Sequence, residues 1–208
     1  MSIANEVYSE LEKMFPIVKS ELNFQNAYEL TIAVILSAQT TDVSVNKATK
    51  TLFAKYPDFE TLAQATFSEV HECIRFLGLS NSKARHILAL SQELTKKPGG
   101  KIIPDFDFLI TLPGIGRKSA NVILSEGFGV PRIAVDTHVL RVANRLGFIA
   151  SNDPLKVENR LMECYDSAIW HQVHLRLVFF GRYFCKAKNP NCSKCPFFSF
   201  CTYENKKR

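Results

Sequence analysis

Apolar residues along this chain recur at steps of three and four, a spacing that places them on one face of an α-helix. The N-terminal segment shows this spacing in Ile3, Val7, Leu11, Met14 and Val18. The same periodicity predicts helices over residues 29–38, 42–53, 69–77, 82–95, 105–111, 117–126, 155–168 and 171–184. No segment sustains the alternation of a half-buried strand. The pattern therefore predicts an all-α protein.

Polar residues that favour helix N-termini precede most of these runs. The expected caps are Asp42 or a neighbouring Thr, Asp58, Ser68, Ser80 or Asn81, Asp136, and Asp153 ahead of Pro154. Proline fits the first helical position, because an N–H at that position has no partner within the helix. These residues predict where the helices begin.

A tight apolar turn with two glycines, LPGIG at residues 112–116, separates two of the predicted helices. The second of these helices begins at about Arg117. Free backbone N–H groups at a helix start carry partial positive charge and suit a phosphate. The turn equally fits a plain connector between helices, so on its own it leaves both interpretations open.

Two chemically capable side chains stand at consecutive helix starts. Lys118 lies in the first turn after the glycines, where the helix dipole disfavours its cation, so the amine can be neutral and nucleophilic. Asp136 supplies a carboxylate at the start of the next helix, where it is also a good N-cap. The plainer interpretations are a solvated lysine and a cap with no further role. The combination is more specific than either residue alone.

Composition limits the kind of protein this is. The chain has 208 residues and is 46% hydrophobic, which supports a sizeable core in one domain or two small ones. No apolar run is long enough to span a bilayer. The acidic, amphipathic N-terminus lacks the basic region and apolar block of a secretion signal. We therefore expect a soluble protein of the cytoplasm.

The positive charge is concentrated near the C-terminus. The formal net charge is +6, and the segment from residue 182 onward holds seven basic residues against one acid, Glu204. The basic residues are Arg182, Lys186, Lys188, Lys194, Lys206, Lys207 and Arg208. A basic patch suits a polyanion, because released counterions drive association. Charge alone does not exclude a merely soluble basic surface.

Six cysteines divide into two groups. Cys73 and Cys164 lie in helical apolar patterns and are expected to be small buried residues. The other four are Cys185, Cys192, Cys195 and Cys201, spaced C-x6-C-x2-C-x5-C. Four cysteines so close together in an intracellular chain favour a metal over disulfides. Zinc and iron–sulfur clusters both accept four thiolates, so generic spacing leaves both open.

Several motifs together resemble the endonuclease III family of helix–hairpin–helix DNA glycosylases. They are ILSAQTTDVSVNKAT (35–49), LGLSNSKA (77–84), LPGIGRKSAN (112–121), VDTHVLRVANRLG (135–147) and the cysteine-rich tail. The resemblance covers essentially the whole chain in the family's order. It implies two helical lobes flanking a DNA cleft: a six-helix bundle with the hairpin at residues 23–130, and an iron–sulfur domain at residues 1–22 plus 131–208.

The resemblance implies a catalytic pair, one from each lobe. Neutral Lys118 would attack the sugar C1′ and displace the base, forming a Schiff base that leads to β-elimination. Asp136 would stabilise the positive sugar and assist proton transfers. A [4Fe–4S] cluster would be held by Cys185, Cys192, Cys195 and Cys201, whose spacing is similar to the family's cluster loop. The cluster would display the loop lysines, Lys186, Lys188 and Lys194, toward DNA.

The resemblance also implies further DNA contacts. A phosphate would be held at the hairpin, by Gly114, Ile115, Gly116 and the adjoining Arg117. Gln39 and Leu79 match family positions that fill the space left by an extruded nucleotide. His138 would contact a phosphate or hydrogen-bond the backbone. From residue type alone, Gln39 would instead cap the end of its helix and Leu79 would belong to the core.

The implied function is that of a bifunctional DNA glycosylase and abasic-site lyase in base excision repair. The protein would act as a monomer on double-stranded DNA at the nucleoid, with no membrane partner. Lys118 points to oxidised or ring-saturated pyrimidines as substrates, since adenine-mismatch relatives lack this lysine. The alternative is a non-catalytic helix–hairpin–helix module with a structural metal site, which would need neither Lys118 nor Asp136.

Overall fold

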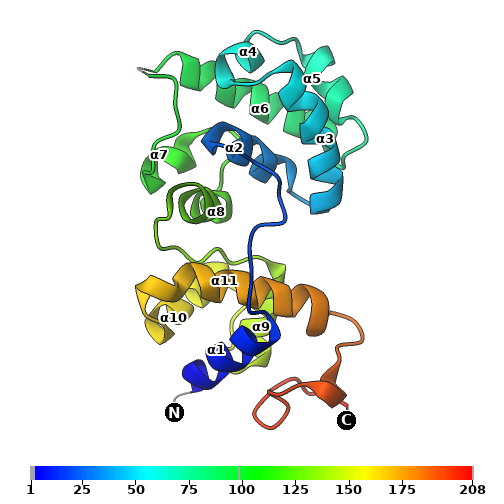
Figure 1. The fold of residues 1–208 in the computed structure, drawn as a ribbon, viewed down its shortest axis with the longest axis vertical. Helices are drawn as coiled ribbons and strands as arrows, with labels where there is room; N and C mark the ends of the chain where they lie inside the picture. The colour runs from blue at the N-terminus through cyan, green and yellow to red at the C-terminus, as the bar shows by residue number, and fades with distance from the viewer. Residues whose placement is uncertain (1–2, 98, 208) are drawn as a thin grey trace. The chain divides into compact units, whose positions relative to one another are not determined.

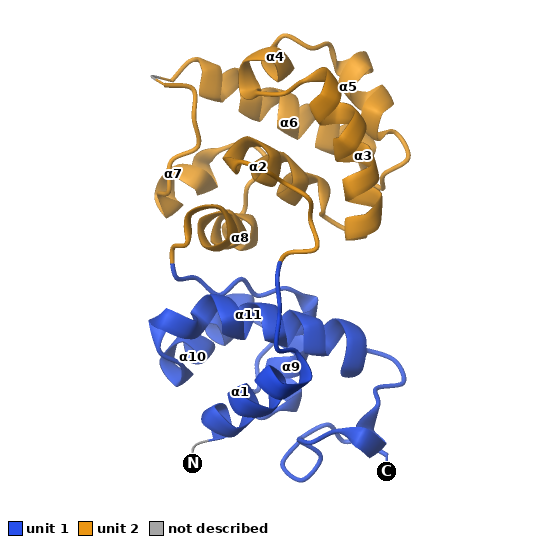
Figure 2. Ribbon diagram, in the orientation of Figure 1, with its two compact units in different colours: residues 1–19, 131–208 blue, residues 20–130 orange. Residues whose placement is uncertain are grey.

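The computed structural model describes residues 3–97 and 99–207, which form helices, turns and loops without any strand (Figure 1). The all-α prediction is therefore confirmed. Met1, Ser2, Pro98 and Arg208 lie outside the described residues, and Arg208 is the last of the expected basic residues. The chain divides into two compact units, coloured separately in Figure 2. Unit 2 is Ser20–Val130, and unit 1 combines Met1–Lys19 with Pro131–Arg208.

Unit 2 is built around a helix that is apolar on all sides, α2 (Ala27–Leu36). Eight of its ten residues are buried, as expected of a helix without a polar face. Three helices of the unit, α3, α6 and α8, pack against it. The helices that follow α2 are α3 (Asp42–Lys55), α4 (Phe59–Ala63), α5 (Phe67–Ile74), α6 (Ser80–Thr95), α7 (Phe106–Thr111) and α8 (Arg117–Phe128).

Unit 1 joins the first helix of the chain to the last ones. Its α-helices are α1 (Ile3–Met14), α9 (Thr137–Arg145), α10 (Pro154–Cys164) and α11 (Trp170–Phe179). The buried Arg176 of α11 donates to the Phe15 carbonyl (3.3 Å), the Tyr8 hydroxyl (3.0 Å) and the Glu12 carboxylate (3.2 Å). This guanidinium therefore fastens α1 to α11 across most of the length of the sequence. Among the described residues, no helix is long and apolar enough to cross a membrane.

The final helix differs from the one predicted over residues 171–184. Regular α-helix ends at Phe179, and Phe180–Phe184 forms a π-helix in which the Cys185 N–H donates to the Phe180 carbonyl at 2.7 Å. The wider turn brings Gly181 against α9: a Cβ atom at Gly181 would lie only 2.9 Å from the Cβ of His138. The apolar pattern indicates which residues are buried, and it does not report whether the backbone hydrogen bonds span four residues or five.

Two of the expected helix starts are wrong, and several are confirmed. Asp58, Asp136 and Asp153 cap their helices as predicted, and Thr41 caps α3. Ser68 does not cap α5, because Thr66 and Glu69 form a capping box two residues earlier. Neither Ser80 nor Asn81 caps α6, which follows Leu79 without a side-chain cap.

The two cysteines outside the tail are less buried than expected. Cys73 and Cys164 are half-buried and pack at the edges of the two hydrophobic cores, one in each unit.

The capping box at α5 predicts a measurable contribution to stability. Hydrogen bonds from Thr66 and Lys55 lower the pKa of the exposed Glu69 carboxyl to about 2. Thr66→Ala should lower the free energy of unfolding by about 1 kcal/mol in urea denaturation, because an orphan amide loses its acceptor. Ser68→Ala is the matched control and should change it little. A larger loss from Ser68→Ala would show that the helix begins there instead.

Candidate active site

The hairpin turn presents backbone amides with room in front of them. Leu112 and Ile115 anchor the turn through their buried side chains, and the Ile115 N–H donates to the Leu112 carbonyl at 3.1 Å. Gly116 is the N-cap of α8 and, having no side chain, offers no side-chain cap to the first amides of α8. A Cβ atom at Gly116 would meet nothing within 4 Å. An anion can therefore approach these amides closely.

Gly114 is required by both conformation and space. Its φ of 80° is left-handed, and a Cβ there would lie 2.9 Å from the Cβ of His86. His86 belongs to α6 and is exposed. The short distance to Gly114 shows that its side chain lies directly against the turn. His86 is not among the site residues predicted from the sequence. The signal that could have found it is its position seven residues after Leu79, on the same helical face.

Lys118 lies in the first turn of α8, directly after Arg117, and both side chains are exposed. Arg117 lies over the Phe106 ring, with its guanidinium carbon 5.0 Å from the centroid, which ties the start of α8 to the start of α7. The sequence alone did not decide whether the Lys118 side chain is partly buried. The exposed side chain is accessible to a large substrate such as DNA.

Asp136 caps α9 with only one of its oxygens. Its Oδ1 accepts the backbone N–H groups of His138 and Val139, each at 2.8 Å. In the part of the chain that the structure describes, Oδ2 accepts no hydrogen bond. The carboxylate is therefore fixed in position while one oxygen keeps its lone pairs for a substrate. The plainer interpretation, in which Asp136 is only a helix cap, accounts for Oδ1 and gives Oδ2 no role.

Arg141, a member of the VDTHVLR motif, connects α9 to the segment that leads to the cysteines. It donates to the Gly181 carbonyl at 2.7 Å and to the Cys185 carbonyl at 3.2 Å. The nitrogen that donates to Gly181, Nη2, also lies 3.3 Å from Nδ1 of His138. Arg141 is not among the site residues predicted from the sequence. Its position one helical turn after His138 could have indicated that the two side chains interact. His138 is thus part of a hydrogen-bond network within unit 1.

Gln39 and Leu79 are both exposed, and both adopt left-handed backbone conformations. Their φ angles are 52° and 59°. The end of α2 is capped by Ser37 rather than by Gln39, and Leu79 is 55% exposed. The interpretations of Gln39 as a helix cap and of Leu79 as a core residue are therefore wrong. Sparsely populated backbone conformations of non-glycine residues cluster at active sites and ligand-binding sites.

The four tail cysteines line one largely apolar cavity together with Phe180 and Phe184. Arg145 donates to the Cys185 sulfur at 3.4 Å. Burial raises the pKa of the Cys195 thiol to about 11 and also raises that of Cys185. Among the described residues, no three His, Cys, Asp or Glu side chains converge as a single metal ion requires. Four cysteines that line one cavity are a set of ligands that a zinc ion and an iron–sulfur cluster both accept.

The basic tail divides into exposed and structural residues. Lys186, Lys188 and Lys194 are exposed on the loop that carries the cysteines. Lys206 instead donates to the carbonyls of Phe198 (2.9 Å) and Cys201 (2.6 Å), which holds the end of the loop in place.

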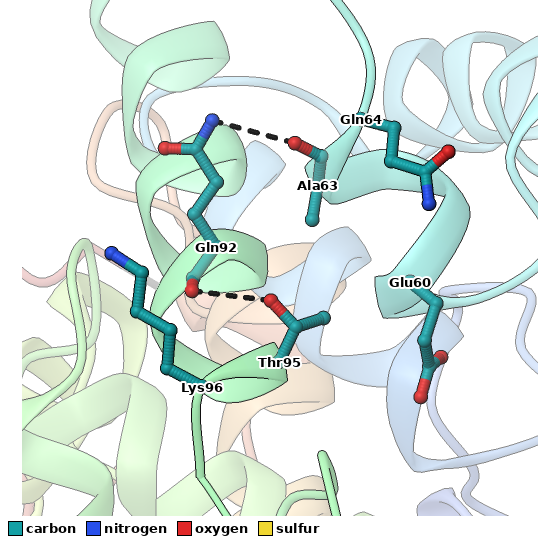
Figure 3. Close-up of a pocket in the computed structure, with 6 residues that line it drawn as sticks. All are labelled: Glu60, Ala63, Gln64, Gln92, Thr95 and Lys96. Carbon is teal, nitrogen blue, oxygen red and sulfur yellow. Dashed lines mark hydrogen bonds between the residues drawn. The ribbon is translucent and has the colours of Figure 1, made fainter.

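A separate pocket of about 360 Å³ lies between α4 and α6 (Figure 3). Gln92 closes one side of it by donating to the Ala63 carbonyl at 3.4 Å. None of the predicted site residues line this pocket, so its size does not make it the active site.

Comparisons with known proteins decide the family. Residues 32–167 match the HhH-GPD superfamily of base excision DNA repair proteins. Endonuclease III of Bacillus subtilis (strain 168) is 47% identical, over 94% of this chain and 89% of that protein. The chain belongs to the endonuclease III family. It is a bifunctional DNA glycosylase and lyase of base excision repair, as the sequence predicted.

Solved structures of endonuclease III bound to DNA match this chain along nearly its whole length. A non-covalent endonuclease III–DNA complex has a TM-score of 0.92 and 46% identity, and it covers 97% of this chain and 96% of its own. A trapped endonuclease III–DNA covalent intermediate, an estranged-adenine complex, also has a TM-score of 0.92 and 46% identity, with 97% of each chain covered.

The contact at Gly114 predicts a loss of DNA binding that a second substitution relieves. Gly114→Ala forces a left-handed alanine against His86, which should cost about 1 kcal/mol for the backbone alone and weaken DNA affinity further by displacing the turn. Adding His86→Gly, which removes the Cβ atom together with the ring, should recover part of the affinity in a fluorescence-anisotropy titration.

Gly129→Ala is the matched control, because Gly129 also has a positive φ of 65° but its Cβ would meet nothing within 4 Å. It should cost stability and leave DNA affinity unchanged. Equal losses of affinity from Gly114→Ala and Gly129→Ala would contradict a role for the turn in binding.

Proposed function

We propose that Lys118 and Asp136 carry out the chemistry, and that the substrates are oxidised or ring-saturated pyrimidines in double-stranded DNA. The observation that carries the proposal is the pair of helix starts. At α8 the amides have no side-chain cap and are followed at once by an exposed lysine, and at α9 a fixed carboxylate keeps one oxygen available. A module that only grips DNA needs neither feature.

The reaction follows from the chemistry of these two groups. The neutral Lys118 Nζ bonds to C1′ of the deoxyribose, the bond from C1′ to the base breaks, and the base leaves with its electron pair and a proton. The nitrogen lone pair then breaks the bond from C1′ to the ring oxygen, which takes up a proton, and the opened sugar is joined to Lys118 as a Schiff base. Loss of a C2′ proton from this Schiff base expels the 3′ phosphate and cuts the strand. Asp136 stabilises the positive charge on the sugar through Oδ2 and assists the proton transfers.

The remaining predicted residues hold the DNA in this proposal. The amides around Gly116 bind a backbone phosphate, and Arg117 and His138 each add a contact to the DNA backbone. Gln39 and Leu79 fill the space left by the extruded nucleotide, which their exposure and fixed backbone conformations support. The exposed lysines 186, 188 and 194 supply long-range attraction to phosphates. One chain contains all of these groups, so we expect a monomer acting on DNA inside the cell.

We infer that Cys185, Cys192, Cys195 and Cys201 hold a [4Fe–4S] cluster, the cofactor that this family usually carries. Two observations support this inference: all four cysteines line one cavity, and the Arg145 hydrogen bond to the Cys185 sulfur suits an anionic thiolate. The cluster would supply a cross-link that orders the C-terminal loop. The chain's own contribution is to display the loop lysines and to position Arg141 and Arg145 against it.

The proposal for Lys118 predicts a covalent adduct that depends on this residue. Borohydride should trap the protein on a duplex with one abasic site, because it reduces the Schiff base to a stable amine. Lys118→Ala should abolish the trapped band on a denaturing gel, whereas Lys101→Ala, which changes a lysine outside α8, should leave it intact. An adduct of full yield in Lys118→Ala would show that another amine is the nucleophile.

The cluster inference predicts iron in the purified protein. After anaerobic purification, the protein should absorb near ~400 nm and contain about four irons per chain. Cys192→Ser should lose both properties, while Cys73→Ser and Cys164→Ser should retain them. A colourless protein with one equivalent of zinc would overturn the assignment.

A further inference from the structure

Lys83 is a buried charged residue with an unusual environment. Its side chain is 3% exposed, and its ammonium donates to the Thr40 hydroxyl. In the described part of the chain no carboxylate pairs with it. Burial lowers the pKa of this amine from its ordinary value. The buried Arg176, by comparison, has an acid among its partners, Glu12.

An unpaired buried cation lowers stability, because water solvates an ammonium far better than one hydroxyl does. A methionine of similar length would fill the same space without that penalty. Residues that break such a local rule are found most often where function requires them. The contact between Lys83 and Thr40 is therefore expected to hold a functional part of the molecule in place.

Lys83 makes a hydrogen bond to each of the two loops that carry Gln39 and Leu79, the residues proposed to fill the space of the extruded nucleotide. Its backbone N–H donates to the Leu79 carbonyl at 3.0 Å, the first helical hydrogen bond of α6. Its ammonium holds Thr40, the residue after Gln39. Gln39 and Leu79 are two of the three non-glycine residues with positive φ in the described chain. One lysine thus connects two left-handed turns that come from distant parts of the sequence.

Thr40 transmits the contact to Gln39. The Thr40 N–H donates to the Ser37 carbonyl at 3.1 Å, and its hydroxyl donates to the Ala38 carbonyl at 3.3 Å while it accepts from Lys83. These bonds close a turn around Gln39. The second loop lies close by, because a Cβ atom at Gly78 would be 3.6 Å from the Gln39 carbonyl oxygen. The two loops form one assembly whose central hydrogen bond comes from Lys83.

We propose that Lys83 is a positioning residue that holds Gln39 and Leu79 in register before DNA binds. The inference rests on the proposed function, in which these two side chains fill the space of the extruded nucleotide. An assembly fixed in advance does not have to be ordered during base extrusion, so more of the binding energy is available to bend and open the duplex. Because Lys83 is buried, it acts through these two side chains and not on the DNA itself.

Substitutions at Lys83 should move stability and base excision in opposite directions. Lys83→Met removes the buried charge and keeps the side-chain length, so its urea midpoint should equal or exceed that of the wild type. Its single-turnover excision rate on a duplex with one dihydrothymine, at saturating enzyme, should fall about tenfold. Strand cleavage at a preformed abasic site should fall less than about threefold, because no base remains to be extruded.

Thr40→Val removes the acceptor without removing the charge and should lower excision by a similar factor. The double variant should be no slower than the slower single variant, because both changes break one contact. This second variant keeps the test decisive if Lys83→Met fails to fold.

Ser91→Ala is the matched control on the same helix. It deletes a buried hydroxyl that donates to the Ile87 carbonyl at 2.7 Å. It should lower stability while leaving the ratio of the two rates unchanged.

Two results would overturn the inference. In one, Lys83→Met and Thr40→Val excise dihydrothymine at the wild-type rate. In the other, both variants lose excision and abasic-site cleavage in equal proportion, as a general loss of folding would produce. Failure of the proposed function is distinguishable from either result, since the wild-type protein would then excise no dihydrothymine or would retain full activity after Lys118→Ala.

Discussion

One carboxylate both starts a helix and stays available for chemistry. Asp136 gives Oδ1 to two backbone amides at the beginning of α9 and leaves Oδ2 without a hydrogen bond in the described part of the chain. A serine or threonine would cap the helix equally well but would offer no second charged oxygen. The helix fixes the carboxylate, and Arg141 then connects that helix to the cysteine loop. The same two hydrogen bonds therefore begin α9 and fix the carboxylate whose second oxygen we propose acts in catalysis.

The start of α8, unlike that of α9, has no side-chain cap. Every helix start leaves backbone amides that need acceptors. At Gly116 no side chain is present to fill that need, and no atom lies where one would be. The amides are left for a phosphate, and the next residues of the helix are Arg117 and Lys118. The amides at α9 have a side-chain cap and those at α8 have none. In the proposed function this difference separates a carboxylate that is held in place from a helix start that binds DNA.

Much of this was predictable because the relevant constraints are local. Apolar spacing predicted the helices, and short polar residues predicted the caps at Asp58, Asp136 and Asp153. The prediction failed where several residues compete: Thr66 caps α5 because Glu69 completes its box, and α6 starts at a left-handed Leu79 that no propensity favours. The π-helix after Phe179, the contact of His86 with Gly114 and the buried Lys83 depend on packing between distant segments, which periodicity does not encode. Family resemblance supplied Gln39 and Leu79, whose residue types alone suggested other roles.

The most direct test of the central claim is to replace Asp136 by asparagine and to measure chemistry and binding separately. Asparagine caps a helix as well as aspartate does, so α9 and the DNA-binding surface should be preserved while the charge is removed. The account predicts that Asp136→Asn lowers the single-turnover excision rate by about a hundredfold or more. Affinity for a duplex with an uncleavable abasic analogue should stay within about a factor of three. Equal losses of rate and affinity would contradict the account and reduce Asp136 to a structural cap.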